Sequence, residues 1–324
     1  MQRLGSVQQK IPCAFCSQVR DEPATKRASQ SFRVVATGEL SAKALQADIQ
    51  HAVATEKVDG TCCYVAKYKD LPYLWARLDR RPTKQAEKRF RKFQSTKTST
   101  EFTWNLDDDF RPVSDSWVPA HGVAQIKGQL QPDENGHIPG WVPVEKESKS
   151  YCWHCSTVNY QTGSALVLKP RAANLEITAV PLAELLEQTL ELVGTSVNGN
   201  PYGLGTKKIP VHVLVSHGSL QIEKPPALNL TDLTTWFEES PEGKVEGIVW
   251  HCANGTLIKL HRHHLGLQWP MPDPYLTARP LSISIDLTKY EWDFETKSSI
   301  LALARLNGKQ FDHFKDIPWE DAES

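Results

Sequence analysis

The sequence lacks an apolar run long enough to cross a membrane. None of its hydrophobic stretches approaches the roughly 18 residues that a membrane-spanning helix requires. Its first residues, MQRLGSVQQKIPCAFC, also lack the basic segment followed by an apolar segment that marks a secretory signal. We therefore expect an intracellular protein, cytoplasmic or nuclear, that is not secreted and has no membrane partner.

The chain also lacks an excess of charge of either sign. Its 37 Lys and Arg residues oppose 38 Asp and Glu residues, which gives a formal net charge of −1. Bulk charge therefore gives no indication of a nucleic-acid partner. The basic residues nevertheless gather in RRPTKQAEKRFRKF (80–93), where Glu87 alone is acidic. Such a segment is either a solvated helix face or a contact for a phosphate backbone.

Cysteine is too sparsely placed for a disulfide framework or a compact zinc ribbon. Two of the seven cysteines form the pair Cys13-x-x-Cys16, and two more form Cys152-x-x-Cys155. The pairs lie much further apart than the roughly 12 to 20 residues that separate the halves of a zinc ribbon. Histidines gather near residues 251–264, where phosphate contact or packing is favoured over a metal site.

Nucleotide-binding loops of the two commonest kinds are missing as well, since neither a Walker A nor a G-x-G-x-x-G sequence occurs. Apolar segments such as TCCYVAKY (61–68), SALVLKP (164–170) and VHVLVSH (211–217) predict strands, and so does YCWHCSTVNY (151–160). Helices such as TKQAEKRFRKFQ (83–94) intervene irregularly. This order indicates an α+β fold of antiparallel sheets rather than an even βαβα alternation.

Composition suggests how the chain is divided. Residues from about 95 to 150 are rich in Trp, Pro and Asp, which is typical of an ordered insertion whose tryptophans need burial. We expect one domain over 1–269 that contains this insertion, and a C-terminal extension over 270–324 with a helix at 295–308.

Chemistry-bearing residues first appear in TEKVDGTCCYV (55–65). Taken alone, Asp59-Gly60 between apolar strands predicts a hairpin turn, with Lys57 as a solvated flank. Further along, EGIVW (246–250) and LIKLH (257–261) read as two strands joined by Ala-Asn-Gly. A glutamate and a lysine in such apolar strands are costly unless satisfied, and one way to satisfy Glu246 and Lys259 is a cross-strand ion pair.

Together and in this order, KVDGT, LELVG (190–194), EGIVW and LIKLH resemble the first, third, fourth and fifth motifs of the covalent lysine nucleotidyltransferases. This superfamily contains the ATP-dependent RNA and DNA ligases and the mRNA capping enzymes. The chain looks most like vertebrate 5′–3′ RNA ligases, along nearly its whole length. The resemblance implies an antiparallel-sheet ligase adenylation fold, and we expect no full OB domain because little chain follows Lys259 and no sixth motif is evident.

The resemblance implies that Lys57 attacks the α-phosphate of ATP and forms a lysyl–AMP intermediate. For this attack the amine must lose its proton, and we expect nearby cations and desolvation to lower the pKa of Lys57. The fifth-motif lysine, Lys259, is expected to neutralise the α-phosphate. The other expected nucleotide contacts are Glu56, Asp59, Gly60, Arg77, Glu191 and Glu246.

Among these, Glu191 is expected to hold the ribose, with Glu145 and Glu176 as less suitable alternatives for the third motif. Glu191 and Glu246 are also the expected ligands of Mg²⁺ or Mn²⁺. The family often has a second lysine in the fifth motif, and here His261 takes that place. The second cation could then be His261 or Arg262.

The implied activity is ATP-dependent joining of an RNA 5′-phosphate to a 3′-hydroxyl, as in RNA repair, through an adenylylated RNA. No obligate protein partner is evident. The candidate RNA contacts in the basic segment are Arg80, Arg81, Lys88, Arg89 and Lys92. The alternatives are a DNA ligase or a guanylyltransferase of the same superfamily, or a non-catalytic protein that binds RNA ends.

Overall fold

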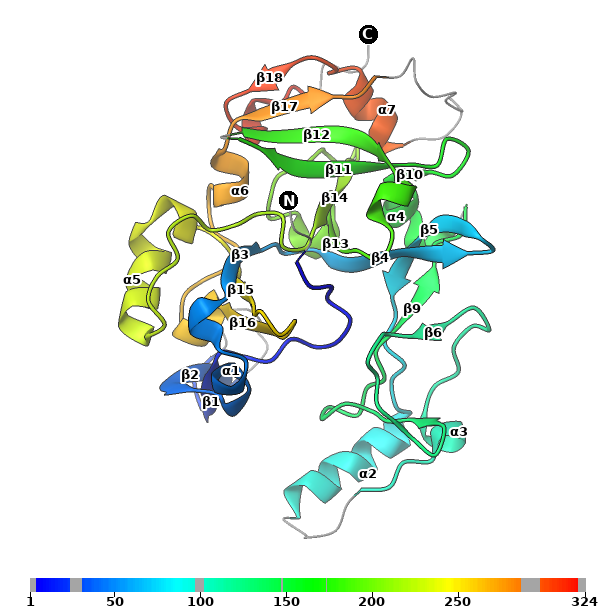
Figure 1. Cartoon of the computed structure of the whole chain (residues 1–324), viewed down its shortest axis with the longest axis vertical. Coiled ribbons are helices and arrows are strands. Elements are labelled where there is room, and N and C mark those ends of the chain that lie inside the picture. Colours follow the sequence, from blue (N-terminus) through cyan, green and yellow to red (C-terminus); the bar gives the residue numbers. More distant parts are fainter. Residues whose placement is uncertain are drawn as a thin grey trace.

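Two β-sheets that share no strand form the framework of the fold (Figure 1). The computed structural model describes residues 4–23, 31–96, 102–146, 148–172, 174–286 and 298–319. The large sheet has 11 strands in the order β18-β17-β12-β11-β14-β13-β4-β5-β9-β6, with β10 also paired to β11. The small sheet has three strands in the order β16-β15-β3. The α+β class is therefore confirmed.

The strands of the large sheet are β4 (Thr61–Tyr68), β5 (Leu71–Arg77), β6 (Val118–Pro119), β9 (Gly140–Pro143), β10 (Val158–Asn159), β11 (Ser164–Arg171), β12 (Asn174–Pro181), β13 (Thr189–Gly194), β14 (His212–Ser216), β17 (Leu281–Ser284) and β18 (Gln310–Phe311). The small sheet contains β3 (Val53–Lys57), β15 (Gly247–His251) and β16 (Leu257–His261). Two further hairpin-like pairs are β1 (Phe15–Arg20) with β2 (Arg33–Leu40), and β7 (Gln125–Ile126) with β8 (Gln129–Leu130).

The α-helices are α1 (Ala42–Gln46), α2 (Lys84–Ser95), α3 (Leu106–Asp109), α4 (Cys152–Cys155), α5 (Leu230–Glu239), α6 (Tyr275–Ala278) and α7 (Ser299–Ala304). Short 3₁₀ helices are η1 (Ile49–His51), η2 (Lys149–Tyr151), η3 (Leu182–Leu185), η4 (Val197–Gly199), η5 (Pro241–Gly243), η6 (Arg262–Leu265) and η8 (Phe314–Asp316). Among the described residues, no helix is both long and apolar enough to span a bilayer.

The large sheet is mixed, so the expectation of purely antiparallel sheets is wrong. β11 runs parallel to β14, and β12 runs parallel to β17, while the other pairs are antiparallel. Both faces of its centre are buried: Leu166 and Leu168 lie in one apolar cluster, and Ala165 and Val167 lie in another. Burial on both faces explains why the sequence of β11 is a continuous apolar run.

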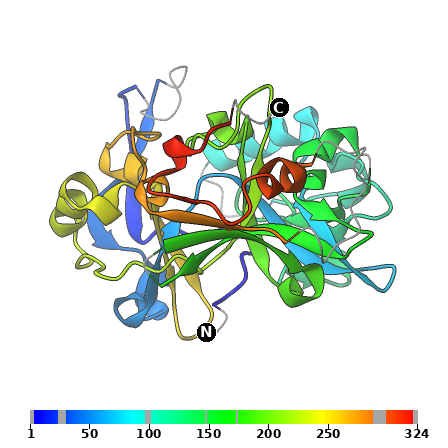
Figure 2. The ribbon, with the colours of Figure 1, turned by 90° about the horizontal axis from the view of Figure 1, so that it is seen from above.

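The C-terminal part of the chain packs on this sheet. β17 and β18 extend its edge beyond β12 (Figure 2). Ile300 and Leu303 of α7 join the same apolar cluster as Leu281 and Ile283. The expected helix at 295–308 is confirmed over Ser299–Ala304, and residues 295–297 lie outside the described residues. The expected strand at 151–160 is wrong over its first half, where the chain forms α4.

The small sheet has one apolar face and one polar face. Ile248 and Trp250 pack with Phe237 of α5 beneath the sheet. Residues of the opposite parity, Lys57 and Lys259 among them, therefore point to the other face. An arm that carries α2 and α3 projects from the β9–β6 end of the large sheet (Figure 1).

The chain passes from the small sheet to the large sheet at Val58-Asp59-Gly60. β3 pairs with β15, and β4 pairs with β13 and β5, so the hairpin turn that Asp59-Gly60 would predict when taken alone is not formed. Gly60 lies so close to β13 that a Cβ atom there would sit 2.2 Å from the carbonyl oxygen of Leu192. Glycine is therefore required by the approach of two backbones rather than by a turn.

We predict that Gly60→Ala destabilises the protein, because the added methyl group has to push β13 away from the crossover. Overpacking of this kind costs roughly 1–3 kcal/mol in free energy of unfolding, which denaturant titration measures. Gly38→Ala is the matched control, since a Cβ at Gly38 meets nothing within 4 Å. Equal stability of the two variants would contradict the crossover geometry.

Candidate active site

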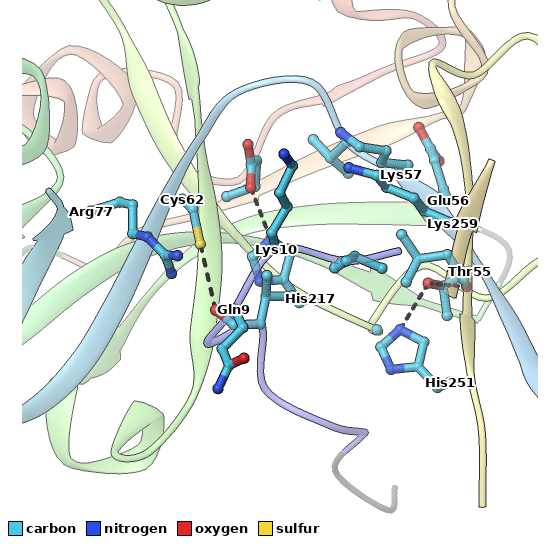
Figure 3. Close-up of a pocket in the computed structure, with 16 residues that line it drawn as sticks. Gln9, Lys10, Thr55, Glu56, Lys57, Cys62, Arg77, His217, His251 and Lys259 are labelled. Atoms are coloured by element: carbon cyan, nitrogen blue, oxygen red, sulfur yellow. Dashed lines mark hydrogen bonds and ion pairs between the residues drawn. The ribbon is translucent and has the colours of Figure 1, made fainter. Parts of the chain in front are cut away.

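A pocket of about 240 Å³ lies where the two sheets and the N-terminal segment meet (Figure 3). The small sheet contributes Thr55, Glu56, Lys57, Val249, His251 and Lys259, the large sheet contributes Cys62, Arg77 and Glu191, and loops contribute Val58, His217 and Gly218. The N-terminal segment contributes Val7, Gln9, Lys10 and Ile11. The pocket therefore assembles residues from distant parts of the sequence.

Strand register explains why Lys57 and Lys259 share the pocket. Lys57 pairs with Gly247, and Lys259 pairs with Val249, which stands two residues further along the central strand β15. Residues two apart point to the same face, so both lysines extend from the polar face of the small sheet. Figure 3 shows these two side chains and Lys10 extending into the same space.

Lys57 is held by a carboxylate. Its Nζ donates a hydrogen bond of 2.6 Å to Oε2 of Glu246, whose side chain is only 2% exposed. Burial lowers the pKa of Lys57, but the negative charges of Glu246 and Glu191 outweigh burial and raise the pKa above its ordinary value. The expectation of a lowered pKa is therefore wrong, because carboxylates rather than cations are the dominant charged neighbours of Lys57.

Lys259 is in the opposite electrostatic state. Burial, together with the positive charges of Lys57 and Lys10, lowers the pKa of Lys259. Within the part of the chain that the structure describes, its ammonium group has no ion-pair partner, so the cross-strand pair with Glu246 is not formed. Lys259 is thus a half-buried cation that an anionic ligand would stabilise.

Neither candidate for the second motif cation has that role in the structure. Burial lowers the pKa of His261 to about 3, so the ring is neutral, and its Nδ1 lies 3.3 Å from Oε1 of Glu246. The Arg262 guanidinium instead donates to the carbonyl oxygens of Phe237 and Gly243, which lie away from the pocket. Lys10 is the third lysine that lines the pocket, beside Lys57 and Lys259.

Lys10 was not predicted from the sequence. It lies far from the motifs along the chain, and only the path of the N-terminal segment brings it to the pocket. That path is fixed by backbone hydrogen bonds from Lys259 N to Pro12 O and from Ala14 N to Lys259 O. No periodicity or spacing in the sequence indicates this contact.

Asp59 fixes the crossover rather than lining the pocket. Its Oδ1 accepts a 2.8 Å hydrogen bond from Asn198 Nδ2, and its Oδ2 accepts a 2.7 Å hydrogen bond from Trp269 Nε1. Its backbone N–H donates to the hydroxyl of Tyr202. These contacts tie the residue between Lys57 and the large sheet to two separate loops.

Glu191 and Arg77 lie on the large-sheet wall. Glu191 Oε2 lies 2.8 Å from Nε2 of His217, a residue that sequence reasoning also missed. Arg77 reaches the same wall, but its guanidinium already contacts Asp79 Oδ1 at 2.5 Å and the carbonyl oxygen of Gln8 at 2.6 Å.

Glu56 points away from Lys57, and its carboxylate accepts a 2.8 Å hydrogen bond from Arg279. The two alternatives to Glu191, Glu145 and Glu176, do not line this pocket.

The basic segment forms α2, and its side chains divide into two sets. Phe90 and Phe93 pack against Phe102 and Trp104 of the arm, and Arg89 pairs with Asp109 at 2.5 Å. Arg80 donates to the carbonyl oxygens of Arg111 and Leu106. Both arginines are therefore engaged within the arm itself.

The opposite side of α2 carries exposed lysines. Lys84, Lys88 and Lys92 stand four residues apart, so they form one exposed stripe. In the described ranges, neither these lysines nor Arg81 makes an ion pair or a side-chain hydrogen bond. The stripe offers phosphate contacts without breaking any contact of the arm.

The chain is similar to known proteins along nearly its whole length. The sequence model of a family described as RNA ligase 1 matches residues 1–320. A protein named RNA ligase 1 from Rattus norvegicus is 57% identical over 321 residues, which cover 98% of this chain and 99% of that protein. RNA ligase 1 from Danio rerio is 56% identical over 324 residues, with 99% and 100% covered.

We predict that Trp269→Phe destabilises the protein, because it removes the indole N–H that Asp59 Oδ2 accepts while leaving a ring in place. Loss of a hydrogen bond to a buried carboxylate costs about 1–3 kcal/mol in free energy of unfolding. Trp236→Phe is the matched control, since the buried Nε1 of Trp236 has no hydrogen-bond partner in the described structure. If the two replacements have the same effect in denaturant titration, Asp59 does not fix the crossover through Trp269.

Proposed function

This chain belongs to the RNA ligase 1 family, and from that premise we propose that it is an ATP-dependent RNA ligase acting through Lys57–AMP. It would join an RNA 5′-phosphate to a 3′-hydroxyl end. The observation that carries the proposal is a half-buried lysine, Lys57, at the wall of a pocket that gathers two further ammonium groups, those of Lys10 and Lys259. Such a cluster of cations favours a triphosphate ligand, because ammonium groups held close together repel one another unless negative charge neutralises them.

In the first step, the Nζ lone pair of Lys57 attacks the α-phosphorus of ATP. A P–N bond forms as the bond from this phosphorus to the oxygen bridging the β-phosphate breaks, and pyrophosphate leaves with the electron pair. Lys57 releases a proton to solvent. Before this step the ammonium group has to leave Glu246 and release a first proton to solvent, because their 2.6 Å hydrogen bond stabilises the protonated form.

In the second step, an oxygen of the RNA 5′-phosphate attacks the adenylyl phosphorus, the P–N bond breaks, and Lys57 recovers a proton. In the third step, the RNA 3′-hydroxyl attacks the activated 5′-phosphate, loses its proton, and displaces AMP. Fixed cations stabilise the transition states of all three steps, because every step spreads negative charge over phosphate oxygens. Lys259 and Lys10 supply that charge in this chain.

The proposed nucleotide contacts divide along the two walls. Glu191 would accept hydrogen bonds from the ribose, with Arg77 beside it, and Lys259 would contact the α-phosphate. Glu56, Asp59 and Gly60 would act by positioning Lys57, since Glu56 and Asp59 are tied to Arg279 and Trp269 and Gly60 packs on β13.

Mg²⁺ or Mn²⁺ fits the carboxylate oxygens of Glu191 and Glu246, which are the ligand type that hard divalent ions prefer. Both carboxylates act electrostatically on Lys57, so they lie close enough to serve one reaction centre. A bound ion supplies positive charge that competes with Lys57 for these carboxylates and so favours the neutral amine.

We predict that α-labelled ATP with Mg²⁺ leaves label covalently on the wild-type protein, and that Lys57→Ala reduces it to background because the attacking nitrogen is gone. Lys67→Ala, which removes an exposed lysine of β4, is the control and should label like wild type. Adding 5′-phosphorylated RNA should then move the label from protein to RNA.

Wild-type label no higher than that of Lys57→Ala would end the covalent proposal and leave an RNA-end-binding protein as the better reading. Stronger labelling from GTP than from ATP would indicate a guanylyltransferase. Transfer to 5′-phosphorylated DNA in preference to RNA would indicate a DNA ligase.

We also propose that the exposed side of α2 lies along the RNA backbone. Arg81, Lys88 and Lys92 remain candidates from the sequence, and Lys84 joins them because it shares their stripe. Arg80 and Arg89 would support this surface through their contacts within the arm.

We predict that replacing Lys84, Lys88 and Lys92 with Gln weakens RNA joining while leaving self-adenylylation near wild type, because only the later steps need RNA. Loss of three phosphate contacts should reduce the slope of log affinity against log salt by about 2 for single-stranded RNA. Replacing the exposed Lys43, Lys67 and Lys224 with Gln removes the same charge elsewhere and is the control. An equal loss of adenylylation and joining would refute the assignment of this surface.

A further inference from the structure

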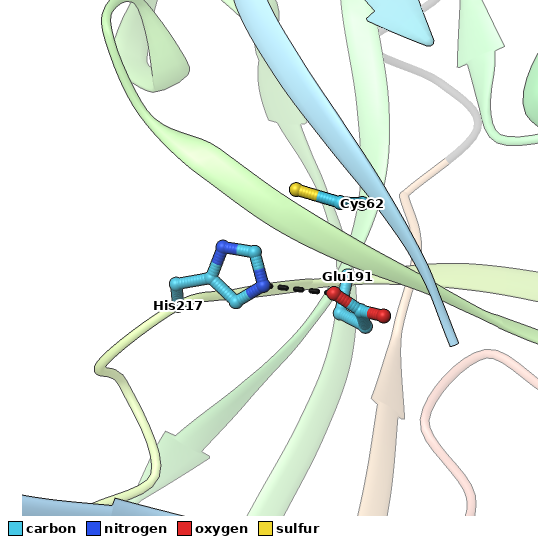
Figure 4. Close-up of side chains that lie close together, drawn as sticks. All are labelled: Cys62, Glu191 and His217. Carbon is cyan, nitrogen blue, oxygen red and sulfur yellow. Dashed lines mark hydrogen bonds and ion pairs between the residues drawn. The ribbon is translucent and has the colours of Figure 1, made fainter. Parts of the chain in front are cut away.

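Cys62, Glu191 and His217 form a group of three possible metal ligands on the large-sheet wall (Figure 4). One ligand atom from each residue lies within 4.8 Å of the other two. Among the described residues no other group of three His, Cys, Asp or Glu side chains comes this close, so neither C-x-x-C pair nor the histidines of 251–264 assemble a comparable group.

Strand register builds this group. Glu191 of β13 pairs directly with Cys62 of β4 on one side and with Val215 of β14 on the other. His217 follows two residues after Val215, so it returns to the face that Cys62 and Glu191 share. A hydrogen bond from His217 N to the carbonyl oxygen of Thr189 continues the β13–β14 pairing to this residue. Strand pairing therefore sets Cys62 and Glu191, and it extends to His217 just past the end of β14.

The imidazole is also oriented for ligation. Nδ1 of His217 lies 2.8 Å from the hydroxyl oxygen of Thr189, and this contact directs Nε2 toward Glu191, 2.8 Å away. Metal-binding histidines typically have one ring nitrogen fixed by such a partner while the other binds the ion. The ligand atoms of a tetrahedral zinc site stand about 3.5 Å apart, so side-chain movements of roughly 1 Å would close the site.

The donor set does not match the ion expected for phosphoryl transfer. Mg²⁺ prefers oxygen ligands, whereas a thiolate, an imidazole and a carboxylate together select zinc-like ions. Thiolate and carboxylate charges would balance a divalent ion, and a fourth position would stay open to water. Burial raises the pKa of the Cys62 thiol, so a bound ion has to displace that proton to solvent.

We propose that Cys62, Glu191 and His217 bind Zn²⁺ or a similar borderline-soft divalent cation, and that this ion inhibits the nucleotide pocket. Inhibition follows because the ion occupies the Glu191 carboxylate and adds a charge on the wall that also carries Arg77. This second half of the proposal rests on the proposed function, in which Glu191 holds the ribose. The first half, zinc binding, does not depend on it.

Binding is tested on the full chain with Co²⁺ as a spectroscopic substitute and with Zn²⁺ in competition against a chromophoric chelator. Wild type should bind one ion with a thiolate-to-cobalt charge-transfer band, and Cys62→Ser should lose the band. Loss of a residue that only supports a metal ligand already costs roughly 10–100-fold in affinity, so loss of the thiolate should cost about 100-fold or more. A Cys152→Ser/Cys155→Ser double variant should bind like wild type.

Inhibition is tested by titrating Zn²⁺ into the labelling reaction at fixed excess Mg²⁺. Wild type and the double variant should lose labelling at low zinc and recover it with chelator, while Cys62→Ser should require about 100-fold more zinc, in proportion to its weaker binding. A Cys62→Ala variant repeats the comparison without any oxygen ligand. A wild-type protein that labels normally but shows no charge-transfer band, or a Cys62→Ser variant with wild-type zinc affinity, would overturn the metal site while leaving the proposed function intact.

Discussion

The short crossover between the two sheets is the constraint on which the site depends. Only Val58, Asp59 and Gly60 separate β3 from β4, so Lys57 has to end one sheet where the other begins. Asp59 is tied to Asn198 and Trp269, and Gly60 rests against β13 without room for a Cβ atom. The crossover thereby fixes the backbone of Lys57, and its ammonium group reaches Glu246 in the pocket.

The position of Lys57 also decides which charges surround it in the pocket. Lys57 faces Glu246 and is stabilised in its protonated form, whereas Lys259 lies half-buried beside two other ammonium groups and is destabilised in its charged form. An incoming polyphosphate would satisfy Lys259 and Lys10 at once. In this account the resting ion pair keeps Lys57 in place, and nucleotide binding relieves the repulsion among the cations.

The motifs could be recognised from the sequence, but their spatial roles only in part. The β15–β16 hairpin was predicted correctly, because an Ala-Asn-Gly loop between apolar runs is a strong local signal. Asp59-Gly60 has the same local signature and yet joins two sheets, since strand partners are decided by burial across the whole fold. α4 was mistaken for a strand because its residues carry no helical period, and it spans only Cys152–Cys155.

The contributions of Lys10 and His217 could not be predicted, because each reaches the pocket through pairing with a segment far away in the chain. The pKa of Lys57 was predicted in the wrong direction, since a sequence shows which charges exist but not which lie nearest.

The most direct test of the account is a peptide map of the wild-type protein after incubation with ATP and Mg²⁺, with the modified residue located by tandem mass spectrometry. The account predicts one adenylyl group per chain, on Lys57. An adenylyl group on Lys10 or Lys259 instead, or a protein that carries none while it joins RNA, would contradict the claim that the crossover lysine is the nucleophile.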